Sequence, residues 1–318
     1  MISYVLTAEA PVASTRALKF GEYAPATVAY KYADEWIPAT TLYGHYCHRA
    51  PGFCRDEDRL FFYPALPAAV VGGGLYGRAD CEKEACVYVD FCTSTAFRGP
   101  KTGGGRVEVV VGADRRPLLE GPKTGGGSRL RMAGIYIDRR AKTAKHGLIY
   151  VYELHQQGAS FVTAANRRLE PGRLGYKKTY GWGLVKPSPL CHVSERRARR
   201  FLLLSPMPVS LLDGQRGGSE RLRQRGGRRR LGRWFYYLSL TNRFYLVGRS
   251  FDEVYLMPMS EVELEEELRP TQLWERLREG LDDLKVYTAT GREVGGETAE
   301  LVKRKAAATM AAPVAALW

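Results

Sequence analysis

The segment 134–185 limits what this chain can fold into more than any other part of it. Residues 135–137 and 148–154 alternate or run apolar, with β-branched and aromatic side chains that are typical of strands. The stretch 138–147 between them is rich in cations, which predicts contacts with phosphate groups. Its candidate RNA-binding residues are Arg139, Arg140, Lys142, Lys145 and His146.

A glycine-rich turn follows at residues 172–183. Its glycines allow the backbone to approach a ligand closely, and cations and aromatic rings alternate with them. The candidates for phosphate contacts and base stacking are Arg173, Tyr176, Lys177, Lys178, Tyr180 and Trp182. The aromatic residues among them could equally pack in the protein core. The strand pair and the turn together predict a sheet that binds a polyanion such as a nucleic acid.

The formal net charge is +14, and much of the excess follows the glycine turn. Residues 194–233 contain twelve arginines, no lysine and three acidic residues. Such a balance favours an acidic partner, although a solvated basic face would have the same composition. The RNA-binding candidates of this stretch are Arg228, Arg229 and Arg230.

The heptad Gly-Pro-Lys-Thr-Gly-Gly-Gly occurs twice, at residues 99–105 and 121–127. Successive glycine amides beside Lys101 or Lys123 could form a nest that accepts an anion. The heptad is not a P-loop, because the order G-x-x-x-x-G-K-[ST] is absent. The two copies are therefore predicted either to contact RNA or to form flexible hairpin ends.

The six cysteines are expected to be thiols rather than disulfides, because the chain is expected to be cytosolic. Cys47, Cys54, Cys81 and Cys86 could provide four ligands for a structural zinc ion, although their spacing is looser than that of C-x2-C pairs. Ordinary buried thiols are the alternative. No cofactor other than this possible zinc is expected.

Two features could support catalysis. His45 lies near an expected first helix, where it could act as a general base, but a lone histidine is more often structural. Asp138 and Glu153 could act as a carboxylate pair, although a salt bridge from Asp138 to a loop arginine explains that residue more simply. Because the sequence has no metal-nuclease pattern, catalytic triad or nucleotide-binding loop, we expect a binding protein rather than an enzyme.

With 318 residues, of which 45% are hydrophobic, the chain is long enough for two domains. A Pro-Ser-Pro sequence after the glycine turn places the expected boundary at residue 190, between a first domain 1–190 and a smaller domain 191–318. No apolar run approaches membrane-spanning length, and the N-terminus lacks the pattern of a signal peptide. We therefore expect a cytoplasmic protein without membrane contact.

The fold class follows from the order of the expected elements. The first domain has predicted strands at 2–12, 56–67, 87–91 and 107–112, a helix at 40–49, and a glycine-rich, irregular stretch at 68–86. The second has predicted strands at 201–204, 234–240 and 244–247, and helices at 261–284 and 297–311. A βα opening followed by more strands predicts an α+β chain: a ferredoxin-like domain with insertions and a smaller α+β domain.

Three segments carry a recognisable motif. The string I-D-R-x-x-x-T-A-x-x-G-x-x-Y-x-Y-E-x-x-x-x-G-x-x-F spans residues 137–161, and the string G-R-x-G-x-x-x-x-x-G-W-G spans residues 172–183. Residues 36–44 read W-I-P-A-T-T-L-Y-G, which is similar to an IPGS-x-LRG motif at the start of a first helix. Together these segments resemble the RAMP superfamily of CRISPR effector proteins.

The resemblance implies a ferredoxin-like (RRM-like) fold and an RNA-binding function. It is closest to the large subunit that caps the 5′ handle of the guide RNA (crRNA) in type III-D complexes, a non-catalytic part of an antiviral ribonucleoprotein. Its implied partners are crRNA, target RNA indirectly, the large signature subunit and the backbone RAMP subunits. A guide-RNA processing endoribonuclease and a repeated backbone subunit are the alternatives within the superfamily.

Overall fold

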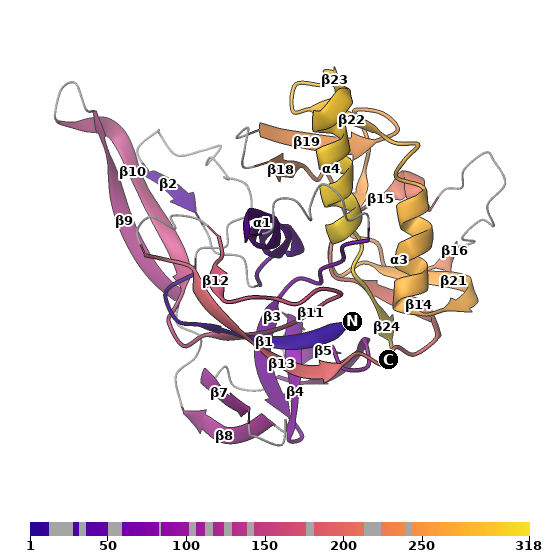
Figure 1. Ribbon diagram of the computed structural model, residues 1–318, viewed down its shortest axis with the longest axis horizontal. Helices are drawn as coiled ribbons and strands as arrows, with labels where there is room; N and C mark the ends of the chain where they lie inside the picture. The colour runs from indigo at the N-terminus through magenta and orange to yellow at the C-terminus, as the bar shows by residue number, and fades with distance from the viewer. Residues whose placement is uncertain are drawn as a thin grey trace.

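The structure is a computed structural model that describes residues 1–12, 28–31, 36–49, 59–82, 84–101, 106–111, 117–123, 129–138, 143–175, 181–212, 224–238 and 243–318. Within these residues the chain is a mixed α+β protein, built mainly of strands with three α-helices (Figure 1). The general α+β class expected from the sequence is therefore confirmed.

A sheet of twelve strands connects the two halves of the described chain. In spatial order its strands are β12 (Gly172–Arg173), β13 (Leu184–His192), β1 (Ile2–Ala8), β11 (Ser160–Ala165), β3 (Leu66–Val71), β4 (Gly74–Glu82), β5 (Ala85–Asp90), β6 (Thr95–Pro100), β24 (Pro313–Ala316), β14 (Ala198–Leu203), β21 (Glu261–Leu268) and β16 (Gln224–Gly226). Strand β13 runs through residue 190, so the expected division of the chain at that residue stays a prediction.

The strands around β1 form the part of the sheet that carries the glycine turn. β1 pairs antiparallel with both β11 and β13, and β11 pairs antiparallel with β3. Side chains of β1 alternate between two cores, because Tyr4 and Leu6 pack with helix α1 (Ala39–Arg49) while Val5 packs in a second core. With both faces of β1 covered, a slip of one residue would exchange the two sets of side chains.

Helix α1 lies where the sequence predicted a helix, at residues 40–49. Ala39, Leu42, Tyr43 and Tyr46 recur at intervals of three and four residues and belong to, or pack against, the same core as Tyr4. The rings of Tyr43 and Tyr46 lie 6.2 and 5.6 Å from the ring of Phe62, measured between centroids. This packing fixes the orientation of α1 on the sheet.

The C-terminal helices complete both cores. α3 (Pro270–Glu279) places Trp274 against Phe61, with ring centroids 4.6 Å apart, and the indole N–H donates to the carbonyl oxygen of Ala307 at 2.8 Å. α4 (Gly296–Thr309) buries Val302 in the C-terminal core and Ala308 in the core beneath α1. α4 also lies beside α1 (Figure 1), so the two halves of the chain share their interior.

Four smaller sheets complete the described strands. They are β2-β10-β9 (Val28–Lys31, Thr143–His155, Arg129–Asp138), β15-β20-β17 (Met207–Pro208, Tyr255–Leu256, Leu231–Gly232), β18-β19-β22-β23 (Tyr236–Leu238, Arg243–Gly248, Lys285–Thr288, Glu293–Val294) and β7-β8 (Arg106–Val111, Pro117–Lys123). A short 3-10 helix, η2, covers Val209–Leu211. None of the helices in the described ranges is long and apolar enough to cross a lipid bilayer.

Three sequence-based expectations about elements were wrong. Residues 68–82 form most of the hairpin β3–β4 rather than an irregular stretch, because Gly72 and Gly73 make its turn with φ of 56° and 82°. The helix expected at 261–284 is the strand β21 followed by α3. Within β21, Val262 and Leu264 are buried at strand spacing, and α3 begins at Pro270. Of the strand expected at 56–67, residues 59–65 form only isolated bridges, and 56–58 lie outside the described residues.

The cysteines also differ from expectation. Cys81 bonds to Cys86, its direct neighbour across the β4–β5 hairpin, and Cys92 bonds to Cys191. Cys47 is disulfide-bonded as well, whereas Cys54 lies outside the described residues. A sulfur in a disulfide has no thiolate to offer a metal, so the expected zinc ligands Cys81, Cys86 and Cys47 are corrected to disulfide partners. No group of potential metal ligands occurs elsewhere in the described ranges.

The two disulfides described above differ greatly in the length of chain that they close. The Cys92–Cys191 pair has a sequence separation of 99 residues, against 5 for the Cys81–Cys86 pair. Because the entropy removed from the unfolded chain grows with loop length, we expect Cys92→Ser/Cys191→Ser to lower the free energy of unfolding by about 4 to 5 kcal/mol, and Cys81→Ser/Cys86→Ser by about 2 kcal/mol. Denaturant unfolding measures both. Equal losses would contradict the loop-length argument.

Lys305 gives the fold a pH dependence. It is 7% exposed on α4, its ammonium group donates to the carbonyl oxygen of Tyr237, and burial lowers its pKa to about 8. The unfolded chain keeps this proton up to a pH of about 10.4. The unfolded state therefore binds more protons between these values, and the free energy of unfolding should rise with pH across that window.

Urea unfolding between pH 7 and pH 10.5 tests this prediction. Lys305→Met should flatten the rise, because the titrating group is gone. Lys303→Met, on the same helix but with an exposed amine, should preserve it. A rise of the same slope in the Lys305→Met variant would show that another group causes it.

Candidate nucleic-acid interface

The base of the glycine turn is built into the sheet. β12 pairs with β13 through Gly172 with Val185 and Arg173 with Leu184. Just inside the turn, the N–H of Leu174 donates to the carbonyl oxygen of Gly183 at 2.8 Å, and the Leu174 side chain is 1% exposed in the core beneath α1. Residues 176–180, which include Tyr176, Lys177, Lys178 and Tyr180, lie outside the described residues.

Gly183 cannot be replaced without moving the turn. Its φ is 84°, and a Cβ atom added there would lie 2.0 Å from the carbonyl oxygen of Leu174. This is the close backbone approach for which glycine is required. The glycine spacing read from the sequence therefore has a structural cause at this position.

Arg173 and Trp182 face each other across the base of the turn. Arg173 is exposed, and its guanidinium group lies 3.4 Å from the carbonyl oxygen of Trp182, at the long end of the hydrogen-bond range. Trp182 is half-buried. Arg173 is thus the predicted phosphate contact whose side chain the structure places at the surface of the turn.

His45 of α1 lies behind the turn. It is 6% exposed, its Nδ1 lies 3.3 Å from the carbonyl oxygen of Arg173, and its Nε2 lies 3.2 Å from the carbonyl oxygen of Glu170. Both neighbours are acceptors, so a neutral imidazole donates to one of them and an imidazolium donates to both. The ring that the sequence offered as a possible general base is directed at backbone atoms of the turn.

The second cationic segment sits on the hairpin β9–β10, whose strands extend away from the main sheet (Figure 1). Asp138 pairs with Thr143 at its end, and residues 139–142, with Arg139, Arg140 and Lys142, lie outside the described residues. Lys145 and His146 lie within β10, at an irregularity between Ala144 and Ile149. The expected loop 138–147 is therefore partly strand.

The same register separates the two carboxylates considered for catalysis. Asp138 pairs with Thr143, whereas Glu153 pairs with Arg131. Positions 131 and 138 of β9 are seven residue steps apart, which corresponds to about 23 Å of strand. Asp138 and Glu153 therefore do not form a carboxylate pair.

Both cationic segments are anchored on one dipeptide, Pro11–Val12. The N–H of Gly183, at the end of the glycine turn, donates to the carbonyl oxygen of Pro11 at 2.7 Å. Val12 and His155, at the end of β10, exchange two backbone hydrogen bonds of 2.9 Å, and Val12 is 0% exposed. The turn and the hairpin thus start from adjacent backbone groups. Nothing in the sequence around residue 11 signalled this junction.

The other predicted RNA contacts are elsewhere. Arg230 forms ion pairs with Asp80 at 2.9 Å and Glu82 at 3.8 Å, and Arg228 lies 3.9 Å from Glu82. Arg229 is exposed. These residues follow β16, at the opposite end of the twelve-stranded sheet from β12, and acids of β4 offset part of their charge.

The heptad lysines occupy two further positions. Lys101 is exposed after β6, and its N–H donates to the carbonyl oxygen of Glu84 at 2.9 Å. Lys123 ends β8, where it pairs with Arg106. The three consecutive glycines that end each heptad lie outside the described residues, so the anion nest stays a prediction.

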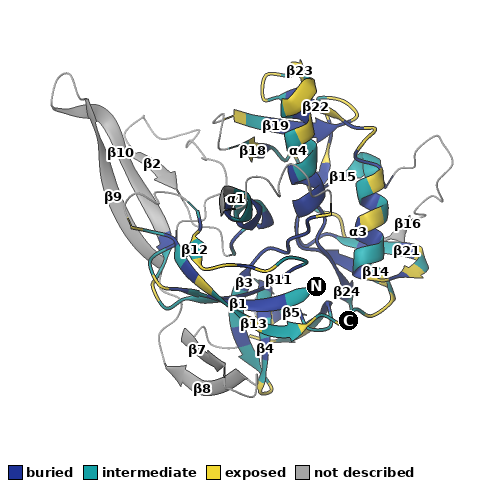
Figure 2. Cartoon of the chain, in the orientation of Figure 1, coloured by how far each residue is buried: buried dark blue, intermediate teal, exposed yellow. Residues whose placement is uncertain are grey.

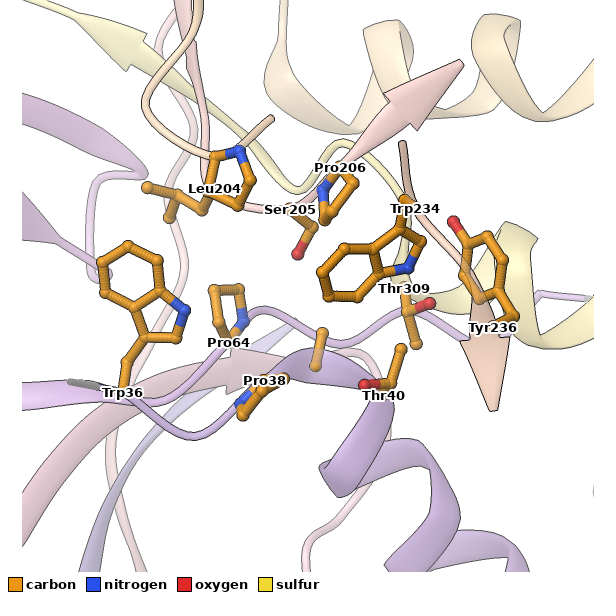
Figure 3. A pocket seen from close by; sticks show the side chains of 12 residues that line it. Trp36, Pro38, Thr40, Pro64, Leu204, Ser205, Pro206, Trp234, Tyr236 and Thr309 are labelled. Carbon is orange, nitrogen blue, oxygen red and sulfur yellow. The ribbon is translucent and has the colours of Figure 1, made fainter. Parts of the chain in front are cut away.

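The segment 36–44 takes part in an interface between the two halves of the chain (Figure 3). Trp36 and Pro38 face Leu204, Pro206, Trp234 and Tyr236 across a cavity of about 10 Å³, with Pro64 beside them. Such a space holds about one water molecule. This part of the RAMP-like motif therefore packs the fold.

Comparison with known proteins gives distant structural likeness only. No protein-family profile and no curated protein matches the chain. A chain of the type III-B Cmr-beta complex bound to cognate target RNA has a TM-score of 0.41 and 7% identity, and the match covers 95% of this chain and 94% of that one.

Two further Cmr-beta structures contain similar chains. In the complex bound to cognate target RNA and AMPPnP, state 1, the TM-score is 0.45 at 9% identity, covering 90% of this chain and 96% of that one. In the apo state the TM-score is 0.32 at 15% identity, covering 59% of this chain and 96% of that one.

His45 should be a positioning residue for the turn. His45→Ala removes the ring from its part-buried contacts with the carbonyl oxygens of Arg173 and Glu170, at a cost of about 1 kcal/mol. We expect trypsin to cut faster at Lys177 and Lys178 and the affinity for single-stranded RNA to fall about tenfold. His45→Gln, which keeps an N–H donor, should recover part of both. The matched control is Thr290→Ala, which removes an exposed hydroxyl between β22 and β23. Unchanged cleavage in His45→Ala would contradict the positioning role.

Proposed function

We propose that this chain is a non-catalytic crRNA-binding subunit of a type III CRISPR effector complex that caps the 5′ handle of the guide RNA. The observation that carries the proposal is the junction at Pro11–Val12. There the glycine turn and the β9–β10 hairpin, which hold most of the cations expected to meet phosphates, start from neighbouring hydrogen bonds. Because both cationic segments belong to elements that are fixed at the same dipeptide, one continuous polyanion could contact both of them.

The positions of the RAMP-like motifs support this proposal. The motif at 137–161 covers the end of β9, all of β10 and the start of β11, and the motif at 172–183 is the glycine turn. The motif at 36–44 leads into α1, whose His45 contacts the base of that turn. Three segments that are far apart in the sequence thus support one surface.

The strand order supports the ferredoxin-like part of the proposal. β13, β1, β11 and β3 are neighbours in an antiparallel sheet, and α1 connects β1 to the region of β3, as in a βαββαβ unit. The described residues between β11 and β13 contain no helix, and the glycine turn takes this connection. The position beside α1, where a βαββαβ unit has its second helix, is taken by α4.

The chemistry fits single-stranded RNA. Arginine and lysine side chains meet phosphates, and tyrosine and tryptophan rings stack on unpaired bases. In an RNA-guided complex base pairing reads the target, so the protein needs only to hold the guide by its backbone and its handle. Target RNA would then be reached through the guide, and the large signature subunit and backbone RAMP subunits would dock around it.

The lysines of the glycine turn provide the test. Lys177→Ala/Lys178→Ala should weaken binding of repeat-derived handle RNA and flatten the plot of log affinity against log salt by about 1.4, because a single strand loses about 0.7 per phosphate contact. The matched control is Lys285→Ala/Arg292→Ala, which removes two exposed cations from the region of β22 and β23. It should leave the slope unchanged.

Three outcomes would reject parts of the proposal. Absence of RNA binding by the wild-type chain removes the function altogether. Cleavage of repeat RNA without added metal makes the chain a processing nuclease. Several copies per particle in native mass spectrometry make it a backbone subunit.

A further inference from the structure

Four arginines just before and at the start of β14 divide into two pairs. Arg199 lies 3.8 Å from Glu267, and Arg200 lies 3.2 Å from Glu261 and donates to the carbonyl oxygen of Trp318 at 3.1 Å. Arg196 and Arg197 are exposed and form no ion pair within the described part of the chain. The first pair stabilises the fold, whereas the second leaves its charge available to a partner.

Strand β13 links Arg196 and Arg197 to the glycine turn. Its exposed side chains that can donate to a phosphate are Lys186, opposite Thr7, and His192, opposite Ile2. Because the register shifts between Ser3 and Tyr4, these two side chains lie on opposite faces of the sheet, one on each side of the strand edge. Positions 186 and 192 are six residue steps apart, which corresponds to about 20 Å of strand. β13 runs from beside β12 toward the N-terminus (Figure 1), and Figure 2 shows the exposed and half-buried residues along it.

The outer edge of β13 suits a ligand held by charge better than an added protein strand. β12 pairs with β13 only at Leu184 and Val185, and no other described strand pairs with that edge. Pro187 and Pro189 follow, and a proline has no N–H to donate to a neighbouring strand. Prolines on an edge oppose strand addition, which depends on main-chain hydrogen bonds.

The acids near this edge do not cancel its charge. Glu195 follows β13, but its carboxylate accepts hydrogen bonds from the N–H and the hydroxyl of Thr271 at the start of α3. That carboxylate is largely buried, and burial raises its pKa. Glu9 is an exposed acid at the end nearest the glycine turn, where its N–H donates to the carbonyl oxygen of Leu184, and the exposed Glu170 before β12 is paired with Arg168 at 3.0 Å.

We infer that the outer edge of β13, from Lys186 to Arg197, is a second RNA-binding surface that continues the path of a single strand leaving the glycine turn. Lys186, His192, Arg196 and Arg197 contact its phosphates. The inference rests on the proposed RNA-binding function. It adds the direction in which the bound RNA strand runs, from the glycine turn toward the start of β14. No base is read here, because the contacts are to the backbone.

An 18-nucleotide oligouridylate and the full chain provide the test, with binding measured at several salt concentrations. Arg196→Gln/Arg197→Gln should lower the affinity about tenfold and flatten the salt slope by about 1.4, as expected for two lost phosphate contacts. The matched control Arg199→Gln removes a neighbouring arginine that is already paired with Glu267, and it should change the affinity less than twofold.

The possible results separate this inference from the proposed function. If Lys177→Ala/Lys178→Ala weakens binding while Arg196→Gln/Arg197→Gln leaves affinity and slope unchanged, the β13 surface is rejected and the function stands. If the wild-type chain does not bind the oligouridylate or handle RNA, both fail. If Arg196→Gln/Arg197→Gln weakens association with other subunits but not with RNA, the surface binds protein and the inference is wrong.

Discussion

The structure depends on the pairing of one short strand, β24. It lies between β6 and β14, parallel to the first and antiparallel to the second. Ala315 donates to the carbonyl oxygen of Ser94 and Leu317 to that of Ala96, both at 2.9 Å, and the hydroxyl of the buried Tyr63 donates to the carbonyl oxygen of Pro313 at 2.7 Å. Through these bonds the sheet that carries the glycine turn continues into the C-terminal half. Because Val314 and Ala315 are fully buried, separating the halves would expose both apolar side chains and backbone groups.

The elements that the sequence predicted best have one clear periodicity. β1 alternates, α1 and α4 repeat at helical spacing, and all three occur close to where the sequence placed them. The wrong element predictions gave the residue composition of a segment more weight than the spacing of its apolar residues. Glycines at 72–77 suggested irregular chain, although two of them form a hairpin turn, and the glutamates of β21 suggested a helix although Val262 and Leu264 alternate. β24 could not be predicted, because its partners β6 and β14 lie far away in the sequence.

The candidate site divides in the same way. The sequence showed that cations, glycines and aromatic rings occur together at residues 172–183. The structure explains one of these glycines, because Gly183 packs too closely against Leu174 to carry a Cβ atom. The contacts that organise the site are long-range: His45 reaches carbonyl oxygens 125 and 128 residues away, and Arg230 pairs with Asp80 across 150 residues. Sequence reasoning therefore could not assign His45 to the turn. Nor could it separate arginines that pair with acids, such as Arg199, from those that pair with no acid among the described residues, such as Arg196.

The disulfide between Cys92 and Cys191 has a mechanical consequence for this sheet. Cys191 is the penultimate residue of β13, and Cys92 follows β5, so a covalent bond joins a strand near one end of the sheet to the loop after a strand in its middle. Tension applied to β13 from outside would pass into the β5–β6 hairpin instead of peeling the strand away from β1. In the oxidised protein a covalent bond holds β13 against such a force. In the reduced protein only hydrogen bonds and side-chain packing resist it.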